Sequence, residues 1–314
     1  MPDNALPGAG LHGIVPPIVT PFRDDERIDY SAWQRIVDGL LADGVHGLFV
    51  CGSTGEFHAL DFEERTVALR FCRQAAAFRV PVYANVGCVT TRDTVRLAHF
   101  AQSEGIDVLA VVTPYYAHVS QAELLEHYCE VCRAVRIPVI AYNFPQHGGS
   151  SLLPETVGRI AASCDNFAGI KDASGNLAQT AAYRTCAPGR ELAVFNGPET
   201  ILLDALEAGC VGGVSSSMNI APRLFLDLYA AYRAGNLEEA RRLQALAVML
   251  GESQSLHAFP GACKEAMAMI GQPAGPCRKP ILPMPADTRA QLARVIDRLR
   301  DEGYIPASHR KRGA

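Results

Sequence analysis

Short apolar runs alternate with amphipathic stretches along most of the chain. Most of the runs are apolar throughout, which is typical of strands in a parallel sheet that is covered on both faces. The stretches between them place apolar residues on one helical face, as Trp33, Ile36, Val37 and Leu40 do within 30–44. This pattern predicts eight strands, at residues 13–20, 46–50, 80–86, 107–113, 137–144, 167–172, 192–197 and 212–217.

Each predicted strand is followed by a helix or a short helical segment, at a spacing of about 25–35 residues that suits one βα unit. Eight such units predict an α/β fold, a (β/α)8 TIM barrel. The rival fold, a doubly wound open sheet, usually carries G-x-G-x-x-G after its first strand, whereas here that strand runs into TPFRDD. The pattern becomes purely helical beyond residue 222. We therefore expect a barrel over 1–222 and a C-terminal helical extension over 223–314, packed on the barrel.

The composition favours a globular protein that acts on small molecules. Of the 314 residues, 48% are hydrophobic and 20% are charged, which permits a large core. The net charge of −4 gives no reason to expect nucleic acid or an anionic membrane as a partner. The chain has no apolar run of membrane-spanning length, and MPDNALPGAGLHG lacks the features of a secretory signal. We expect a cytoplasmic protein.

The ten cysteines are scattered, often within apolar runs, and are expected to pack as small buried hydrophobes. Cys129 and Cys132 form a C-x-x-C within a predicted helix. There is no second such pair and no H-x3-H, so packing is favoured over metal binding or redox chemistry.

The ends of the predicted strands carry the candidate chemistry, because active sites of these barrels lie at the carboxyl ends of the strands. Hydroxyls, glycines and one amine occur there, in CGSTGEF (51–57), TPYY (113–116), YNFP (142–145), Lys171, NGPET (196–200) and SSSMN (215–219). The ends carry no H-x-H, H-E-x-x-H or carboxylate cluster, so we expect no catalytic metal.

Lys171 is one of only four lysines, although lysine and arginine together number 29. Burial at the end of an apolar strand would lower its pKa, and a neutral amine attacks a ketone to form a Schiff base. The alternative is a structural lysine, paired with Asp172 or reaching solvent.

Three neighbouring motifs favour the catalytic interpretation. Tyr142 lies 29 residues before Lys171, which places the two on adjacent strands. Tyr142 and Tyr116 could transfer protons, and the glycine turn of CGSTGEF could hold a carboxylate with backbone N–H groups. An ordinary turn and packing aromatics remain the alternatives for these two motifs.

GSTGE, TPYY, YNFP and GIKD, in this order and spacing, resemble the dihydrodipicolinate synthase / N-acetylneuraminate lyase family of pyruvate-handling class I aldolases. The resemblance runs from about Gly13 to the C-terminal helices and implies the same barrel fold. It implies that Lys171 forms the Schiff base with the 2-keto carbon and that Tyr142 transfers protons in a relay with Ser53 and Tyr116.

The resemblance also implies that Ser53 and Thr54 hold the pyruvyl carboxylate. Tyr115 matches an aromatic residue that crosses a tight dimer interface in the synthases. Members of the family are commonly tetramers built as dimers of dimers, so we expect a homotetramer.

Within the family, synthases usually place an arginine shortly after the YNxP motif to bind the carboxylate of aspartate semialdehyde. This chain has His147 near that position, and an imidazole is a poor substitute for a bidentate guanidinium. The residues GEF of the first motif, Phe144 and the C-terminal segment 259–283 resemble the corresponding residues of the 2-keto-3-deoxy sugar acid (gluconate/galactonate) aldolases. The candidate substrate-binding residues are Ser53, Thr54, His147, Gly197, Glu199, Thr200 and Ser215.

The expected function is therefore a Schiff-base aldolase, a lyase that reversibly cleaves a 2-keto-3-deoxy sugar acid to pyruvate and an aldehyde such as glyceraldehyde. This imine chemistry is expected to need no metal and no organic cofactor. The alternatives are 4-hydroxy-tetrahydrodipicolinate synthase, an N-acetylneuraminate-type lyase, a dehydratase acting through the same imine, and a non-catalytic metabolite-binding protein.

Overall fold

The computed structural model describes residues 10–272 and 274–306. Eight strands form one parallel sheet with the order β1-β8-β7-β6-β5-β4-β3-β2. They are β1 (Gly13–Ile14), β2 (Leu48–Val50), β3 (Val82–Asn85), β4 (Val108–Val112), β5 (Val139–Asn143), β6 (Phe167–Asp172), β7 (Ala193–Asn196) and β8 (Gly212–Gly213). The (β/α)8 TIM barrel is confirmed.

The barrel closes through the segment that follows β1. Pro17 forms a parallel bridge with Phe49 of β2, and the Phe49 N–H donates to the Pro16 carbonyl at 2.9 Å. The predicted strand 13–20 is regular only at its first two residues, because Pro16 and Pro17 have no N–H to donate to a ladder. The predicted strand 212–217 likewise ends early, at Gly213, and a short helix begins at Ser216.

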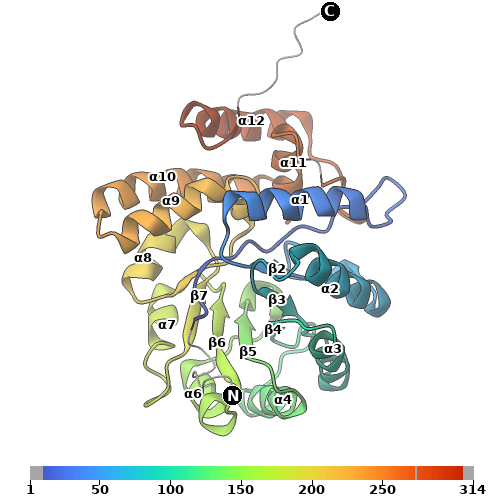
Figure 1. Cartoon of the computed structure of the whole chain (residues 1–314), viewed down its shortest axis with the longest axis vertical. Coiled ribbons are helices and arrows are strands. Elements are labelled where there is room, and N and C mark those ends of the chain that lie inside the picture. Colours follow the sequence, from blue (N-terminus) through green and yellow to red (C-terminus); the bar gives the residue numbers. More distant parts are fainter. Residues whose placement is uncertain (1–9, 273, 307–314) are drawn as a thin grey trace, which may run out of the picture.

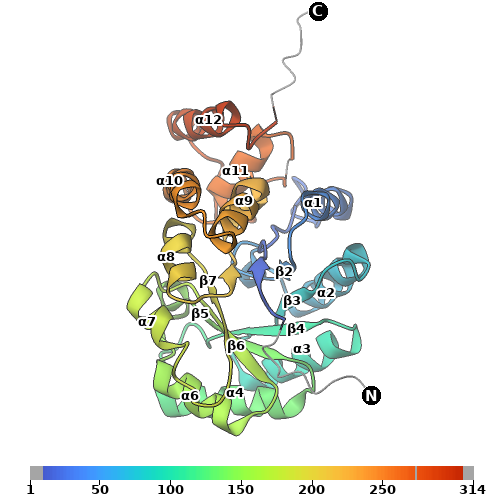
Figure 2. The same ribbon diagram turned by 60° about the vertical axis from the view of Figure 1, so that its left-hand side comes forward.

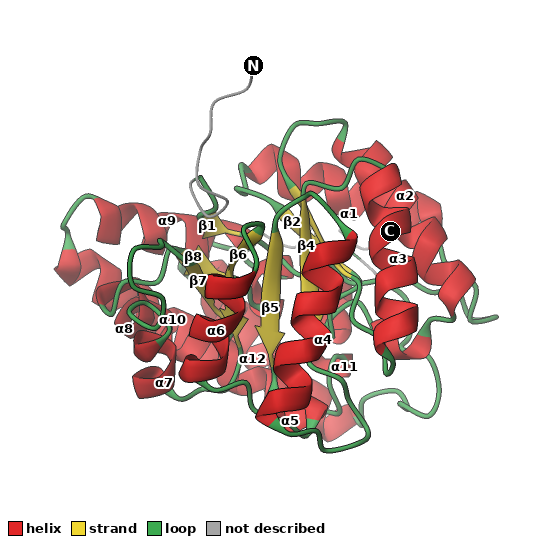
Figure 3. Cartoon of the chain, turned by 90° about the horizontal axis from the view of Figure 1, so that it is seen from below, coloured by secondary structure: helices red, strands yellow, loops and turns green. Residues whose placement is uncertain are grey.

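Helices surround the strands, as Figure 3 shows. The helices that alternate with the strands are α1 (Tyr30–Asp43), α2 (Phe62–Ala76), α3 (Thr91–Ser103), α4 (Gln121–Ala134), α6 (Pro154–Ser163), α7 (Leu177–Ala182), α8 (Leu202–Glu207) and α9 (Pro222–Arg233). Shorter helical turns follow several strands, namely η1 (Phe57–Ala59), α5 (Pro145–Gly148), η2 (Glu199–Ile201) and η3 (Ser216–Asn219).

Helix α1 shows how sequence pattern becomes packing. Asp29 caps its N-terminus by accepting from the Ala32 N–H at 2.9 Å, and Gly44 ends it in the left-handed conformation at φ 88°. The predicted apolar face is buried, including Trp33, which is fully inaccessible to solvent. Trp33 stacks on Phe71 of α2, with ring centroids 5.3 Å apart.

The C-terminal part of the chain is helical, as expected. It continues from α9 through α10 (Leu237–Ser253), η4 (Gln254–Leu256), α11 (Gly261–Met269) and α12 (Ala286–Asp301). Figures 1 and 2 show α11 and α12 stacked at one end of the molecule, beyond α9, α10 and α1. The predicted boundary at residue 222 falls at the first residue of α9, which contacts both β1 and α10. That division into two parts stays a prediction.

Within residues 10–272 and 274–306, no helix is long and apolar enough to cross a membrane. The prediction of no secretory signal concerns the N-terminal stretch of the sequence. The first nine residues of that stretch lie outside the described residues. All ten cysteines are free, and eight of them, including Cys129 and Cys132, are buried. Their burial agrees with the expected packing role.

Candidate active site

Lys171 lies one residue before the end of β6, and its side chain is buried, with 4% of the residue exposed. In the sheet it pairs with Tyr142 of β5 and with Phe195 of β7. The amine lies 4.1 Å from the ring centroid of Tyr142 and 4.5 Å from that of Phe49. Burial lowers the pKa of Lys171 to about 7, and the negative charge of Glu199 partly opposes that shift. A large fraction of the amine is therefore neutral near pH 7.

The structural alternative for Lys171 was a pairing with Asp172 or a side chain that reaches solvent, and the side chain is buried. The carboxylate of Asp172 instead accepts from Asn143 Nδ2 at 2.8 Å and from Thr180 Oγ1 at 2.6 Å. It also accepts from the Ser174 hydroxyl at 2.9 Å. Because successive residues of a strand point to opposite faces, Asp172 serves this buried network while Lys171 points into the barrel. Neither Asp172 nor solvent therefore satisfies the Lys171 amine.

Tyr142, which neighbours Lys171 in the sheet, forms a pair of hydroxyls with Ser53. Ser53 Oγ lies 3.1 Å from Tyr142 Oη, and either oxygen could be the donor. Burial raises the pKa of Tyr142, while the hydrogen bond to Ser53 opposes this shift. Tyr142 is thus a neutral phenol at pH 7, and it can take up a proton only as it passes its own proton along the hydrogen bond to Ser53.

A cavity of about 190 Å³ opens over Lys171 and Tyr142. Thr54, Gly197, Glu199 and Ser215, all predicted from the sequence, contribute to its lining, as do Phe144 and Phe259. The Glu199 carboxylate accepts from the Ser217 hydroxyl. The hydroxyl of Ser215 is buried and has no hydrogen-bond partner among the described residues, so it is available to a ligand.

A second cavity, of about 270 Å³, adjoins the first, since Phe144 and Phe259 line both. Its lining includes Ser53, Phe57, His58, Tyr115 and His147. His147 packs on Phe144 with ring centroids 4.4 Å apart. Burial lowers the pKa of His147, and His58 lowers it further. Burial also lowers the pKa of His58, so both imidazoles are neutral at pH 7.

Two predicted site residues are not brought to the cavities. Tyr116 is 97% exposed and has a φ of 80°, so within one chain it does not join Ser53 and Tyr142. Thr200 lies on η2 but lines neither cavity. Tyr115 instead lies against the second cavity, with its ring 5.6 Å from that of Phe57 in an edge-to-face contact.

Sequence reasoning missed several residues that shape the site. Phe49 packs against both the amine and the Tyr142 ring, whose centroid is 5.9 Å away. An apolar strand residue gives no signal of such a role. Phe259 reaches both cavities from the segment before α11, and the sequence offers no motif that places it there. Phe57 could have been found, because it is the last residue of the CGSTGEF motif, which was predicted to lie at a strand end.

Over residues 10–272 and 274–306, no group of three or more His, Cys, Asp or Glu side chains is arranged to hold a metal ion. The expectation that the reaction needs no metal or organic cofactor stays a prediction.

Known proteins share both the sequence and the fold of this chain. The Dihydrodipicolinate synthetase family profile matches residues 10–299. A 4-hydroxy-tetrahydrodipicolinate synthase from Acidiphilium cryptum is 36% identical over 282 residues, which cover 90% of this chain and 96% of that protein. An uncharacterized DapA-like lyase from Halobacterium salinarum is 36% identical over 297 residues, which cover 93% of this chain and 97% of that protein.

Among solved structures, YagE from E. coli K12 is described as a prophage protein of the dihydrodipicolinic acid synthase family, in complex with pyruvate. It superimposes with a TM-score of 0.89 at 33% identity, covering 93% of this chain and 99% of YagE. The profile match, the relatives and the shared barrel confirm the predicted resemblance: this chain belongs to the dihydrodipicolinate synthetase family of Schiff-base lyases and aldolases.

Proposed function

We propose that the protein is a class I aldolase that reversibly cleaves a 2-keto-3-deoxy sugar acid to pyruvate and an aldehyde such as glyceraldehyde. The observation that carries this proposal is the buried amine of Lys171 beside the hydrogen-bonded pair of Tyr142 and Ser53. A neutral amine and a proton-transferring hydroxyl are the two groups that imine-based cleavage of a carbon–carbon bond requires.

The reaction begins when the neutral Lys171 amine attacks C2 of the keto acid, and the carbinolamine then loses water to give an iminium. The Tyr142 oxygen accepts the proton of the C4 hydroxyl while it passes its own phenol proton along the hydrogen bond to Ser53 and on to water, and the C3–C4 bond breaks. The bonding electrons move onto the iminium nitrogen, which leaves an enamine, and the aldehyde departs. The enamine is protonated at C3, and water hydrolyses the resulting imine to release pyruvate and regenerate the amine of Lys171.

The turn at Ser53 and Thr54 holds the substrate carboxylate in this proposal. Both residues are buried, and Thr54 lines the cavity over Lys171. A carboxylate bound there places C2 next to the amine, which supplies the orientation that the attack needs.

The sugar hydroxyls bind along Gly197, Glu199 and Ser215, which line the same cavity. The unpartnered Ser215 hydroxyl supports this assignment, because a buried polar group without a partner is costly unless a ligand satisfies it. His147 meets the far end of the substrate from the second cavity. Thr200 lines neither cavity, so its role requires a shift of η2 that the structure does not contain.

The main alternative is 4-hydroxy-tetrahydrodipicolinate synthase, which is the name of several of the relatives. In that reaction the aldehyde partner, aspartate semialdehyde, carries a carboxylate of its own. None of the residues that line the second cavity is an arginine or lysine. Its neutral imidazoles and aromatic rings suit hydroxyls and C–H faces better than a second anion.

The exposed side chain of Tyr116 is relevant to the oligomeric state of the protein. An aromatic side chain that is 97% exposed is poorly placed in a monomer, and Tyr116 can join the relay only if it enters the site of another copy. We therefore keep the homotetramer, with Tyr115 and Tyr116 at a dimer interface, as part of the proposal. Sedimentation velocity of the wild type and of Tyr116→Asp tests it, since the variant should dissociate.

The experiment that tests the substrate is an aldehyde panel in the condensation direction, with pyruvate held constant. Glyceraldehyde should give the largest kcat/KM. A larger value with aspartate semialdehyde would establish the synthase, and a larger value with N-acetylmannosamine would establish the neuraminate-type lyase. Binding of pyruvate without turnover of any aldehyde would indicate a metabolite-binding protein.

A further inference from the structure

A buried ion pair joins the CGSTGEF turn to the C-terminal helices. Lys264 Nζ of α11 lies 2.5 Å from Glu56 Oε1, and the two side chains are 3% and 1% exposed. The same amine donates to the Pro276 carbonyl at 2.9 Å and lies 4.4 Å from the Phe22 ring centroid. Chain segments from both ends of the sequence therefore meet at this ion pair.

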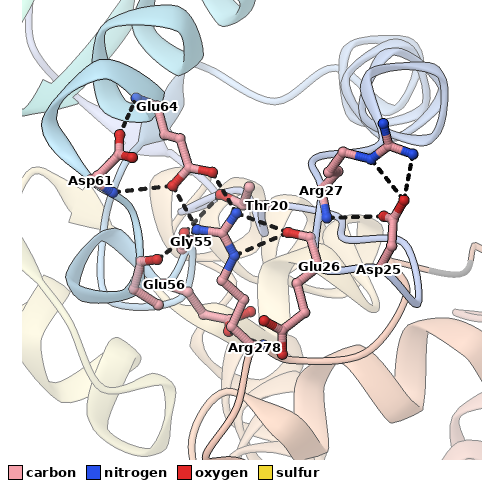
Figure 4. A network of polar contacts seen from close by, with 10 residues as sticks. Thr20, Asp25, Glu26, Arg27, Gly55, Glu56, Asp61, Glu64 and Arg278 are labelled. Atoms are coloured by element: carbon pink, nitrogen blue, oxygen red, sulfur yellow. Dashed lines mark hydrogen bonds and ion pairs between the residues drawn. The ribbon is translucent and has the colours of Figure 1, made fainter.

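Glu56 is held at a second point as well. Its other oxygen, Oε2, accepts from the Arg278 backbone N–H at 3.0 Å. The Arg278 side chain donates to the Glu26 carbonyl and the Glu64 carboxylate, as Figure 4 shows, and it also donates to the Ala59 carbonyl. The segment 264–278 thus contacts the turn through the charge of Lys264 and through a backbone donor whose position the Arg278 side chain fixes.

The backbone connects Glu56 tightly to the substrate-binding residues. Glu56 adopts the left-handed conformation at φ 53°, and its N–H donates to the Ser53 carbonyl at 3.0 Å. Gly55 donates to the Gly52 carbonyl at 3.0 Å, and its own carbonyl accepts from Thr20 Oγ1 at 2.7 Å. A displacement of Glu56 is therefore transmitted directly to Ser53 and Thr54.

We propose that Glu56 and Lys264 are positioning residues, which fix the turn so that Ser53 and Thr54 meet the substrate carboxylate and Ser53 meets Tyr142. The proposal rests on the proposed function for the role of the turn in binding pyruvate. A non-glycine residue in the left-handed region carries local strain, and the two anchors of its carboxylate hold it there. The cavity that Lys171 lines would otherwise lose a defined wall.

The test uses the double variant Glu56→Gln/Lys264→Met, because a single replacement of Lys264 would leave a buried carboxylate unpaired and could unfold the protein. Replacement of both charges by neutral groups of similar volume is often tolerated. The control is Glu265→Gln, which removes the exposed ion pair with Arg289 one position further along α11. Thermal melts establish that each variant is folded.

The first readout is hydrogen–deuterium exchange of the free enzyme over residues 51–57. We expect faster exchange in the double variant and wild-type exchange in Glu265→Gln. The second readout is steady-state kinetics. Loss of the turn geometry should raise KM for pyruvate by about 10- to 100-fold, because small misplacements of binding groups cost this much, with a smaller change in kcat.

If Glu56 and Lys264 only stabilise the fold, the folded double variant should show wild-type exchange at residues 51–57 and a wild-type KM for pyruvate. This outcome would overturn the proposal. Faster exchange at the turn, in a protein whose wild type forms no pyruvate adduct on Lys171, would uphold the positioning role and reject the proposed function.

Discussion

Ser53 Oγ and Tyr142 Oη lie 3.1 Å apart, although 89 residues separate them in the chain. Ser53 comes from the turn after β2, and Tyr142 comes from β5, next to Lys171 of β6. The barrel thus assembles an amine and two hydroxyls from three separate strand ends. The reactivity of each of these groups should depend on the other two.

Tyr142→Phe removes the phenol oxygen but keeps the ring against the Lys171 amine. Turnover should fall by about 10²- to 10⁴-fold, the usual contribution of a positioned acid–base group. Formation of the imine with pyruvate should fall much less, because the amine keeps its buried environment. Rapid-quench measurement of adduct formation beside steady-state kcat checks this. Equal losses in both would argue against Tyr142 as the base for bond cleavage.

Burial lowers the pKa of Lys171 to about 7. The reaction should therefore accelerate as the pH rises through about 7. Only the neutral amine attacks, so kcat/KM should fall about tenfold for each pH unit below that pKa and level off above it. A pH profile measured with a saturating partner aldehyde gives the value. A plateau reached only near pH 10 would indicate a lysine with an ordinary pKa.

The same shift has a consequence for stability. The pKa of Lys171 is about 7 in the folded protein and near its ordinary value of 10.5 when the chain unfolds. Between these values the unfolded state binds more protons, so the free energy of unfolding should rise with pH, by up to about 1.4 kcal/mol per unit from this group. Urea unfolding of the wild type and of Lys171→Met, at pH 7, 8 and 9, isolates the effect of this residue. A difference between the two proteins that does not change with pH would contradict it.

His147→Arg places a guanidinium in the second cavity. The variant should gain at least about tenfold in kcat/KM for aspartate semialdehyde relative to glyceraldehyde, because a charge-assisted hydrogen bond contributes ~1.5–3 kcal/mol. His147→Gln is the matched control, since it keeps a neutral polar group. If both variants change the ratio equally, the charge at this position does not set the preference.

The sequence predicted the barrel well because its signals are local. Apolar runs at regular spacing are direct consequences of a parallel sheet covered on both faces, and all eight strands were found. The strand ends were less accurate where a local feature interrupts the ladder, as Pro16 and Pro17 do after β1. The proximity of Lys171, Tyr142 and Ser53 could be predicted because an amine and hydroxyls at the ends of apolar strands face the barrel mouth. Their catalytic roles stay predictions.

Contacts made by the C-terminal helices could not be predicted in the same way. Phe259 and Lys264 are brought to the site by tertiary packing alone, over sequence distances for which no periodicity exists. The different positions of Tyr115, which lines the second cavity, and Tyr116, which is exposed, could not be predicted for another reason. Adjacent loop residues point in different directions according to backbone conformation, and the φ of 80° at Tyr116 has no sequence signal.

The most direct test of the imine chemistry is borohydride trapping with pyruvate, followed by peptide mass analysis. We predict a single reduced adduct on Lys171, formed faster as pH rises through about 7 and absent from Lys171→Met. An unmodified Lys171 in active enzyme, or an adduct on another lysine, would contradict the central role of this residue.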